Sequence, residues 1–221
     1  PWGLRLHKRL PMTLPALRDG RLEPQDEGSQ LLAQVVRARP GARVLDACAG
    51  AGGKTLALAA MMQDRGELVA EDHDPARLKR LGPRAERAGL RCLRRAGGGL
   101  FDAVLVDAPC SGSGRLRRNP EARLHRPDLE ALHAQQLAIL TAAAARVKPG
   151  GQLVYATCSF SARENHEVVN AFLASDPAFT REDLRQRAGW AALALDGPDL
   201  QLWPHRHQTD GFYAASLLRQ G

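Results

Sequence analysis

The fold is decided by one stretch, Asp46-Ala47-Cys48-Ala49-Gly50-Ala51-Gly52-Gly53-Lys54-Thr55. The apolar residues before it predict a strand over 43–48, and the run that ends in Met61-Met62 predicts a helix over about 53–63. A strand, a glycine-rich turn and a helix form the place where an open α/β sheet binds a nucleotide-like ligand. Glycine lets the backbone approach that ligand closely, and the helix N-terminus offers unpaired N–H groups.

The spacing of the glycines excludes two common ligands of such a turn. A phosphate loop needs a glycine, four further residues and then Gly-Lys-Thr, and Cys48 stands where that first glycine should be, before Gly53-Lys54-Thr55. A dinucleotide fingerprint needs Gly-x-Gly-x-x-Gly, which the glycines here do not give. The remaining common ligand is S-adenosylmethionine, whose sugar and amino-acid part can lie against the turn. From this stretch alone, a purely structural glycine-rich turn stays open as the alternative.

Composition favours a single domain with a polyanionic partner. The 221 residues carry 31 Lys and Arg against 24 Asp and Glu, a net charge of +7, and this length usually forms one domain. A mere surplus of solvated arginine is the alternative, but an arginine fork suits phosphate oxygens well. The basic residues gather near the N-terminus and in one later loop: Arg5, Lys8, Arg9, Arg18 and Arg21, then Arg115, Arg117, Arg118, Arg123 and Arg126.

The cysteines and the ends of the chain indicate the setting. Cys48, Cys92, Cys110 and Cys158 show no C-x-x-C spacing, which argues against zinc or another metal and favours free thiols in a cytoplasmic protein. No apolar run reaches the roughly 18 residues of a membrane span. The first residue is not Met, so we expect a piece of something longer. Residues 1–24 are interpreted as a basic arm left from an upstream domain, and 25–221 as the catalytic domain of a monomer.

The rest of the chain alternates strands and helices. We expect a mostly parallel, doubly wound Rossmann-like methyltransferase sheet that ends in an antiparallel strand pair at its edge. Residues 176–198 show no clear pattern. The expected helices are 25–38, 75–88, 128–147 and 164–174, and the expected strands are 68–70, 91–93, 101–106, 152–156, 200–203 and 212–218.

Acidic residues after the second strand predict the contact to a ribose. An acid about 20 residues past the glycine turn usually holds the ribose hydroxyls, which favours Asp72 or Glu71. Asp74 before Pro75 is explained as a helix N-cap. After the third strand comes Ala96-Gly97-Gly98-Gly99, an abrupt join with no acid.

Two thiols and a carboxylate follow strand ends at the expected ligand edge. Asp107 and Cys110 follow the strand 101–106, and Cys158 follows the strand 152–156. A thiol beside a methyl donor suits methylation of a pyrimidine at carbon 5, because a thiolate added at carbon 6 makes carbon 5 nucleophilic. Lys54 could supply the positive charge that favours the thiolate, and Asp107 could stabilise the adduct. This reasoning does not rank the two thiols. The base must leave its stack, and the arginine-rich loop can grip the flanking phosphates.

Seven motifs together resemble the RNA 5-methylcytosine methyltransferase family, and the branch of bacterial ribosomal RNA small-subunit methyltransferase B (Sun-type) is most similar. The resemblance covers about 20–220, and two separate cysteine motifs make it specific. The motifs are Asp46 to Thr55, Asp107-Ala-Pro-Cys-Ser-Gly-Ser-Gly114, Arg117-Arg-Asn-Pro120, Lys148-Pro-Gly-Gly151, Tyr155-Ala-Thr-Cys-Ser159, Glu164-Asn165 and Asp210-Gly-Phe-Tyr213.

The resemblance implies a role for each matched position. Cys158 would be the nucleophile, and Cys110 would assist release of the product. Asp72 would bind the ribose, and Asp107 would lie between the donor and the cytosine. The methionine part of S-adenosylmethionine would be wrapped by Cys48, Ala49, Gly50, Ala51, Gly52, Gly53 and Lys54. The substrate would be RNA, above all 16S ribosomal RNA, gripped by Arg115, Arg117, Arg118 and Arg126.

Two departures from the family pattern leave other functions open. The family usually has Ala-Pro where this chain has Gly50-Ala51, and its third strand normally ends in an acid that contacts adenine. A catalytically silent RNA-binding or ribosome-assembly module, or a tRNA cytosine methyltransferase, therefore stays as an alternative. Methylation of DNA is disfavoured, because the resemblance places the nucleophile in the Thr-Cys motif.

Overall fold

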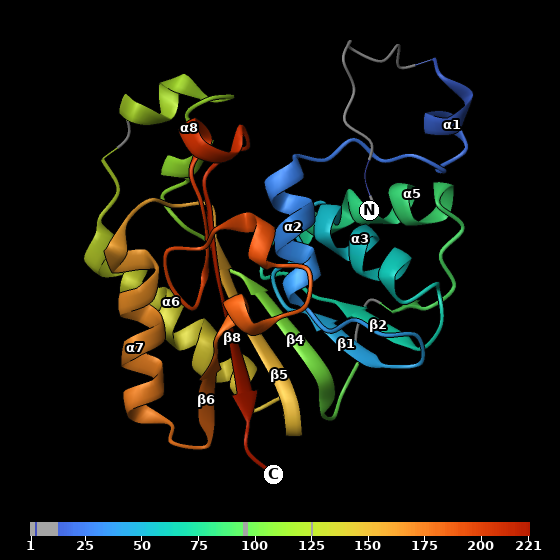
Figure 1. The fold of residues 1–221 in the computed structure, drawn as a ribbon. Coiled ribbons are helices and arrows are strands. Elements are labelled where there is room, and N and C mark those ends of the chain that lie inside the picture. Colours follow the sequence, from blue (N-terminus) through green and yellow to red (C-terminus); the bar gives the residue numbers. More distant parts are fainter. Residues whose placement is uncertain (1–2, 4–12, 95–96, 125) are drawn as a thin grey trace.

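A twisted sheet runs through the centre of the molecule, with helices on both faces (Figure 1). The computed structural model describes residues 3, 13–94, 97–124 and 126–221. The described strands are β1 (Arg43–Asp46), β2 (Glu67–Ala70), β3 (Leu93–Arg94), β4 (Phe101–Asp107), β5 (Val147–Thr157), β6 (Phe179–Glu182), β7 (Leu200–Leu202) and β8 (Phe212–Arg219). The described α-helices are α1 (Pro15–Arg18), α2 (Glu27–Val35), α3 (Gly53–Met61), α4 (Pro75–Lys79), α5 (Leu81–Arg87), α6 (Leu129–Ala144), α7 (His166–Ser175) and α8 (Pro204–His207).

The order of the strands confirms the predicted fold class. Across the sheet the order is β3-β2-β1-β4-β5-β8-β6, and β7 pairs with β8 beside this path. The pairs from β3 to β5 are parallel, whereas β8 runs antiparallel to β5, β6 and β7. The sheet is therefore doubly wound and mostly parallel, with antiparallel strands at its C-terminal end.

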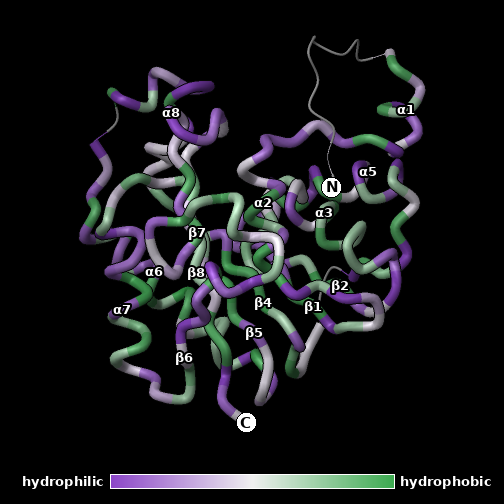
Figure 2. The backbone as a smooth tube through the Cα atoms, in the orientation of Figure 1, coloured by the Kyte–Doolittle hydropathy of each residue, from purple (hydrophilic) through white to green (hydrophobic). Residues whose placement is uncertain are grey.

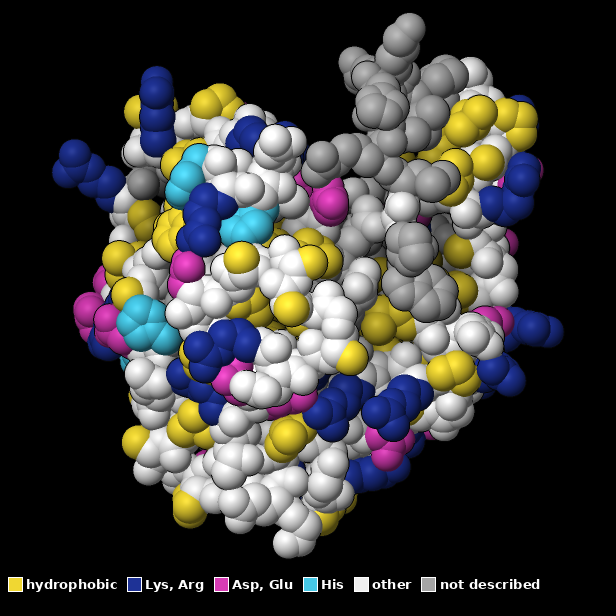
Figure 3. Space-filling view, viewed as in Figure 1, with side chains coloured by type: hydrophobic (Ala, Val, Ile, Leu, Met, Phe, Trp, Pro, Cys, Tyr) yellow, Lys and Arg dark blue, Asp and Glu magenta, His cyan; other side chains and the backbone are white. Residues whose placement is uncertain are grey.

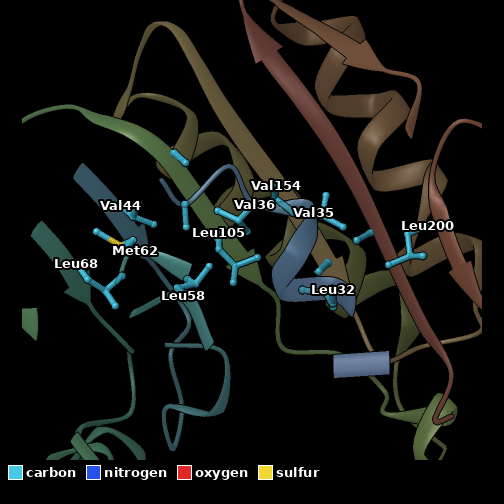
Figure 4. Packing of buried hydrophobic residues seen from close by; sticks show 14 of the residues in the cluster. Leu32, Val35, Val36, Val44, Leu58, Met62, Leu68, Leu105, Val154 and Leu200 are labelled. Atoms are coloured by element: carbon cyan, nitrogen blue, oxygen red, sulfur yellow. The ribbon is translucent and has the colours of Figure 1, made fainter. Parts of the chain in front are cut away.

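The two faces of the sheet are buried by different helices, because successive side chains of a strand point to opposite faces. Val44 of β1 packs in a cluster with Leu32 of α2 and Leu58 of α3, as Figure 4 shows. The next residue, Leu45, packs in the opposite cluster with Leu140 of α6 and Phe172 of α7. In Figure 2 the central strands are accordingly mostly green, whereas purple segments lie toward the outside. None of the described helices is both long and apolar enough to cross a membrane.

The described part of the N-terminal arm lies against α5. Leu17 of α1 is buried, and Glu23 accepts hydrogen bonds from Arg84, at 2.7 Å, and from Arg87. Arg5, Lys8 and Arg9 lie outside the described residues. The origin of the arm in an upstream domain stays a prediction.

Several predicted boundaries were wrong, and each has a physical reason. The helix expected over 75–88 is two helices, α4 and α5, because Pro83 near the start of α5 has no N–H to continue the α4 ladder. The third strand lies at 93–94 rather than 91–93. The segment 176–198 contains β6, which pairs with β8. The terminal strand β8 is therefore internal, between β5 and β6, and not at the sheet edge.

Candidate active site

Three neighbouring parallel strands bring the predicted residues to one edge of the sheet. The glycine turn follows β1, Asp107 ends β4, and Cys158 follows β5 directly. Backbone bonds continue the ladder past the strand ends, because Ala47 N donates to Leu105 O and Ala108 N donates to Ala156 O. The carboxyl ends of these strands therefore meet at the edge where such sheets bind ligands.

The two predicted thiols lie in contact. The Sγ atoms of Cys110 and Cys158 are 3.4 Å apart, although 48 positions separate the residues in the chain. The hydrogen bond from Cys110 lowers the pKa of Cys158 against the effect of burial, and the charges of Lys54 and Arg115 lower it further. The same hydrogen bond, together with burial, raises the pKa of Cys110. Cys158 is therefore the thiol that ionises more readily, a ranking that the sequence alone did not provide.

The other two cysteines are poor nucleophiles. Burial, with the nearby charge of Asp46 next in weight, raises the pKa of Cys48 to about 12. Burial also raises the pKa of Cys92 to about 12, assisted by its contact with Asp64. Because the thiolate is the reactive form, both side chains stay protonated at neutral pH. Within the described residues, no group of three or more His, Cys, Asp or Glu is arranged to hold a metal ion.

Lys54 and Asp107 form an ion pair beside the thiols. Lys54 Nζ donates to Asp107 Oδ2 at 2.6 Å, and the side chains are 13% and 28% exposed. Burial lowers the pKa of Lys54, but the charge and hydrogen bond of Asp107 outweigh it and raise the pKa overall. The ammonium also lies 5.6 Å from the centre of the Phe212 ring. Lys54 is therefore held charged beside Asp107, and its charge lowers the pKa of Cys158, whereas its role in catalysis stays a prediction.

One cavity of about 470 Å³ is lined by both thiols and by Lys54, which follows the glycines of the turn, whereas Cys48 to Gly53 and Asp72 do not line it. This volume lies within the range of small-molecule sites. The turn itself begins α3, with Gly52 in the left-handed region at φ 86°, so the first N–H groups of that helix point out of the turn. The residues present thus fit a donor with a nucleoside and an amino-acid part. The cavity is lined by Pro24, Gln25, Asp26, Ser29, Lys54, Arg77, Asp107, Ala108, Pro109, Cys110, Gly112, Arg115, Arg118, Cys158 and Phe212.

Both acids predicted for the ribose are bonded within the protein. Asp72 Oδ2 accepts a hydrogen bond from Gly50 N at 2.7 Å, its Oδ1 accepts one from Asp74 N, and its side chain is 1% exposed. Glu71 instead forms an ion pair with Arg146. Asp72 therefore holds the glycine turn in this structure, and its contact to a ribose stays a prediction.

The join after β3 is held by two arginines. Arg43 donates to Leu100 O at 2.9 Å and to Gly98 O at 2.6 Å, and Arg146 donates to Gly97 O at 2.5 Å. Both guanidinium groups also lie over the Phe101 ring. Ala96 lies outside the described residues. No acid stands in the described part of the join, as the sequence already indicated.

The predicted RNA-binding arginines divide into two pairs. Arg117 lies 3.0 Å from Asp26 and 3.2 Å from Asp210, and Arg118 donates to Asp210 at 2.6 Å. Arg115 and Arg126 are exposed, and within the described residues neither forms an ion pair. Figure 3 shows basic side chains in dark blue at the upper left, where the segment 113–127 lies. Only the second pair is therefore free to meet phosphate in this structure.

A second cavity of about 520 Å³ lies on the other side of Cys110. Arg126, Pro127, Leu132 and Gln135 contribute to its wall. Cys110 lines both cavities, so the second one continues the thiol site toward the arginine-rich loop.

Some residues around the site carry no role in the sequence prediction. Asp26 caps α2 through Gly28 N and contacts Arg117, and Arg77 lies beside Gly50. Glu164 is fully buried and contacts the residues that follow both cysteines. A signal for Glu164 was present in the sequence, because a serine follows each of Cys110 and Cys158 and can donate to a shared carboxylate.

Comparison with known proteins agrees with this geometry. The family described as 16S rRNA methyltransferase RsmB/F matches residues 33–218. Ribosomal RNA small subunit methyltransferase B of Vibrio vulnificus is 37% identical over 220 residues, covering 94% of this chain and 49% of that protein. The same-named protein of Xanthomonas campestris is 38% identical over 235 residues, covering 98% of this chain and 52% of that protein. The chain thus spans about half the length of these relatives.

A solved structure of the same architecture is NSun6 from Pyrococcus horikoshii with SFG, which superposes with a TM-score of 0.84 at 27% identity and covers 97% of this chain and 57% of that one. These similarities and the strand order define the class of the chain, which has the fold of S-adenosylmethionine-dependent methyltransferases. Within that class, the chain belongs to the RsmB/F family of 16S rRNA methyltransferases. The resemblance of the motifs is thereby confirmed.

Proposed function

We propose that this chain methylates carbon 5 of a cytosine in RNA, with 16S ribosomal RNA as the first candidate substrate. The observation that carries the proposal is the contact of 3.4 Å between Cys110 and Cys158 beside the Lys54–Asp107 pair. The proposal is supported by the lowered pKa of Cys158 and the raised pKa of Cys110, both of which lie after strand ends at one edge of the sheet. A thiol that can ionise, next to a second thiol and a charged pair, is what covalent addition to a pyrimidine ring requires.

The proposed reaction begins with Cys158. Its thiolate adds to carbon 6 of cytosine, and the electron pair of the C5=C6 double bond moves into the ring, which makes carbon 5 an enamine nucleophile. The Asp107 carboxylate accepts a hydrogen bond from the exocyclic amine, and the Lys54–Asp107 pair supplies the proton that ring nitrogen 3 takes up. When bound, S-adenosylmethionine supplies an electrophilic methyl group. A base then removes the carbon-5 proton, whose electron pair re-forms the double bond and expels the Cys158 thiolate, and ring nitrogen 3 returns its proton to the Lys54–Asp107 pair. Cys110 assists this release.

The residues that would hold the donor are those of the turn and the cavity. Gly53 and Lys54 carry the first backbone N–H groups of α3, and Lys54 and Asp107 lie at the cavity wall. Asp72 would take the ribose by giving up its bond to Gly50 N. The Asp72 side chain is buried and bonded within the protein, and no described acid follows β3. A catalytically silent RNA-binding module is therefore the second candidate.

RNA as the substrate is supported by charge and by the names of the relatives. The net charge is +7, and Arg115 and Arg126 are exposed at the edge that carries the thiols. The relatives from Vibrio vulnificus and Xanthomonas campestris are named as ribosomal RNA methyltransferases. A target base must leave its stack to reach a buried thiol, which requires a grip on the flanking phosphates.

Two cysteine variants test the proposal. Cys158→Ala should abolish methyl transfer to 16S RNA, because no adduct can form. Cys110→Ala should instead accumulate a covalent protein–RNA adduct, seen as a slow band on a denaturing gel. If Cys158→Ala traps the adduct and Cys110→Ala does not, the two roles are reversed.

Two further measurements separate the other candidates. Calorimetry with S-adenosylmethionine should show binding, and a wild-type chain that binds no donor at millimolar concentration is the silent module. Bisulfite mapping of RNA from a strain that lacks the protein should show the lost mark in 16S RNA. A mark lost from tRNA would move the substrate there.

A further inference from the structure

A single buried carboxylate connects the two loops that carry the thiols. Glu164 is 0% exposed. Its Oε1 accepts a hydrogen bond from Ser111 N at 2.7 Å, and its Oε2 accepts hydrogen bonds from the hydroxyls of Ser111 and Ser159 at 2.6 and 2.5 Å. Ser111 follows Cys110 and Ser159 follows Cys158. The carboxylate therefore binds the residue next to each thiol, on two segments that are far apart in the chain.

The surroundings of Glu164 are built to hold it in one orientation. Gln136 of α6 donates to Glu164 Oε1 at 3.1 Å and to Pro109 O at 2.9 Å. The Tyr155 hydroxyl donates to the backbone oxygen of Glu164 at 2.6 Å. The next residue, Asn165, donates to Ser159 O at 2.9 Å and accepts from the Thr157 hydroxyl. The start of α7 is thus fixed to both thiol segments.

The absence of a cation makes this arrangement informative. Among the described residues, no Lys, Arg or His forms an ion pair with Glu164, and four hydrogen bonds to its side chain take that place. Burying a carboxylate without a cation costs free energy unless every oxygen is bonded. A neutral side chain would fill the same space at lower cost. What the carboxylate adds is two oxygens that can each accept from more than one donor, so that both segments are joined through one group.

We propose that Glu164 is a positioning residue that fixes the distance between the Cys110 and Cys158 thiols; this inference rests on the proposed function for its effect on catalysis. Within the described hydrogen bonds Glu164 contacts neither thiol, so it acts through the backbone N–H of Ser111 and the hydroxyls of Ser111 and Ser159. With the carboxylate gone, the two segments separate, Cys158 loses the hydrogen bond from Cys110, and attack on the base starts from a misplaced sulfur. A misplacement of about 1 Å costs on the order of a hundredfold in rate.

The test compares Glu164→Gln with Glu167→Gln in the full chain. Glu167 is a half-buried residue of α7, the helix that begins two residues after Glu164, and its variant removes the same charge without contact to either thiol segment. We expect Glu164→Gln to lower kcat by about tenfold to a hundredfold, with KM for RNA and calorimetric donor affinity within about twofold. The pH midpoint for alkylation of Cys158 by iodoacetamide, read by peptide mass spectrometry, should move upward. Glu167→Gln should change neither quantity.

The alkylation midpoint separates positioning from mere stability. An unchanged midpoint in folded Glu164→Gln would overturn the inference, whatever happens to kcat. Ser111→Ala removes one of the four hydrogen bonds to the Glu164 side chain and should give a smaller shift in the same direction, so the inference stays testable if Glu164→Gln does not fold. Where Glu164→Gln folds, the double variant should show less than the sum of both effects. Because alkylation needs no RNA and no donor, it tests Glu164 even if the wild-type chain transfers no methyl group.

Discussion

Asp46 ends β1 directly beneath the glycine turn and is fully buried. The Thr55 hydroxyl donates to its Oδ2 at 2.7 Å, whereas its Oδ1 has no hydrogen-bond partner in the described residues. Burial raises the pKa of Asp46 to about 7, and the neighbouring charge of Asp107 adds to this. The side chain that links β1 to α3 is therefore a carboxyl group that can change its charge near neutral pH.

This raised pKa predicts a stability that falls as the pH rises. Between about pH 4 and pH 7 the folded protein keeps a proton on Asp46 that the unfolded chain has lost, so stability decreases across that window and levels off above it. Asp46→Asn should lack this decrease, and its advantage over wild type should grow from pH 4 to pH 7. Urea unfolding at a series of pH values measures this difference.

Asp102 provides the control of opposite sign. Its pKa is lowered by hydrogen bonds from Lys148 and from the backbone of Arg43, which overcome the effect of burial. Asp102→Asn should therefore lose stability relative to wild type as the pH rises through 4. If the free energy of unfolding changes with pH in the same way for Asp46→Asn and wild type, Asp46 does not hold a proton in the folded protein.

The site was predictable at the level of single residues where a motif adjoins a strand end. Cys110 and Cys158 each follow an apolar run, and parallel strands bring such positions together. The ion pairs of Arg117 and Arg118 could not be predicted in this way. Their partners, Asp26 and Asp210, lie 91 and 92 positions away, and only the folded chain brings them into reach.

At the scale of elements, the turn between β1 and α3 needs glycine at Gly52, where the backbone and the packing both exclude a side chain. Gly52 has φ 86°, and a Cβ there would lie 2.2 Å from Leu81 Cδ1 of α5. Ala51 is different, because its φ is not positive and within the described residues its N–H forms no hydrogen bond. The turn is thus closely packed at Gly52, and although Ala51 O accepts a hydrogen bond from Arg84, the Ala51 N–H makes no bond among the described residues that a proline would break.

We therefore expect opposite effects from two neighbouring substitutions. Gly52→Ala should destabilise the protein by about 2 kcal/mol, because it adds left-handed strain and overlaps Leu81. Ala51→Pro should stabilise it by about 0.4–1 kcal/mol by restricting the unfolded chain. Chemical unfolding and donor calorimetry of both variants measure this. A loss of stability in Ala51→Pro would show that the turn needs the freedom of alanine.

Helices and strands were predicted correctly where the chain has long apolar runs. The prediction failed where pairing with a neighbouring strand decides the conformation. The strand β4 was predicted nearly to the residue, since its burial is continuous. The strand β6 was missed, because Phe179–Glu182 contains a threonine, an arginine and a glutamate and is a strand only through pairing with β8. Pro83 was visible in the sequence, and the break between α4 and α5 could have been predicted from it.

At the scale of the whole molecule, basic side chains are present at both edges of the sheet, but their settings differ. Arg126 lines the cavity beside Cys110, whereas exposed Arg65 precedes β2 and so lies at the opposite edge. A chain with a charge of +7 attracts RNA from any side. Only contacts at the thiol edge, however, hold RNA where the proposed chemistry takes place.

The salt dependence of RNA affinity should reveal this asymmetry. Arg126→Gln should weaken binding and lower the slope of log affinity against log salt by about one, because one phosphate contact is lost. Arg65→Gln removes the same charge and should leave the slope unchanged. Filter binding of a 16S RNA fragment over a salt series measures both. Equal losses in the two variants would indicate diffuse attraction rather than a defined path for RNA.

The distance between Cys110 and Cys158 has a practical consequence for handling the protein. Two sulfurs 3.4 Å apart need to approach by only about 1.4 Å to reach the length of a covalent bond. Hydrogen peroxide can take one proton and one electron from each thiol and leave as two molecules of water, and the bridged protein then has no thiolate with which to attack a base. Purification in air would thus inactivate the protein without unfolding it, and a reductant such as dithiothreitol would restore the activity.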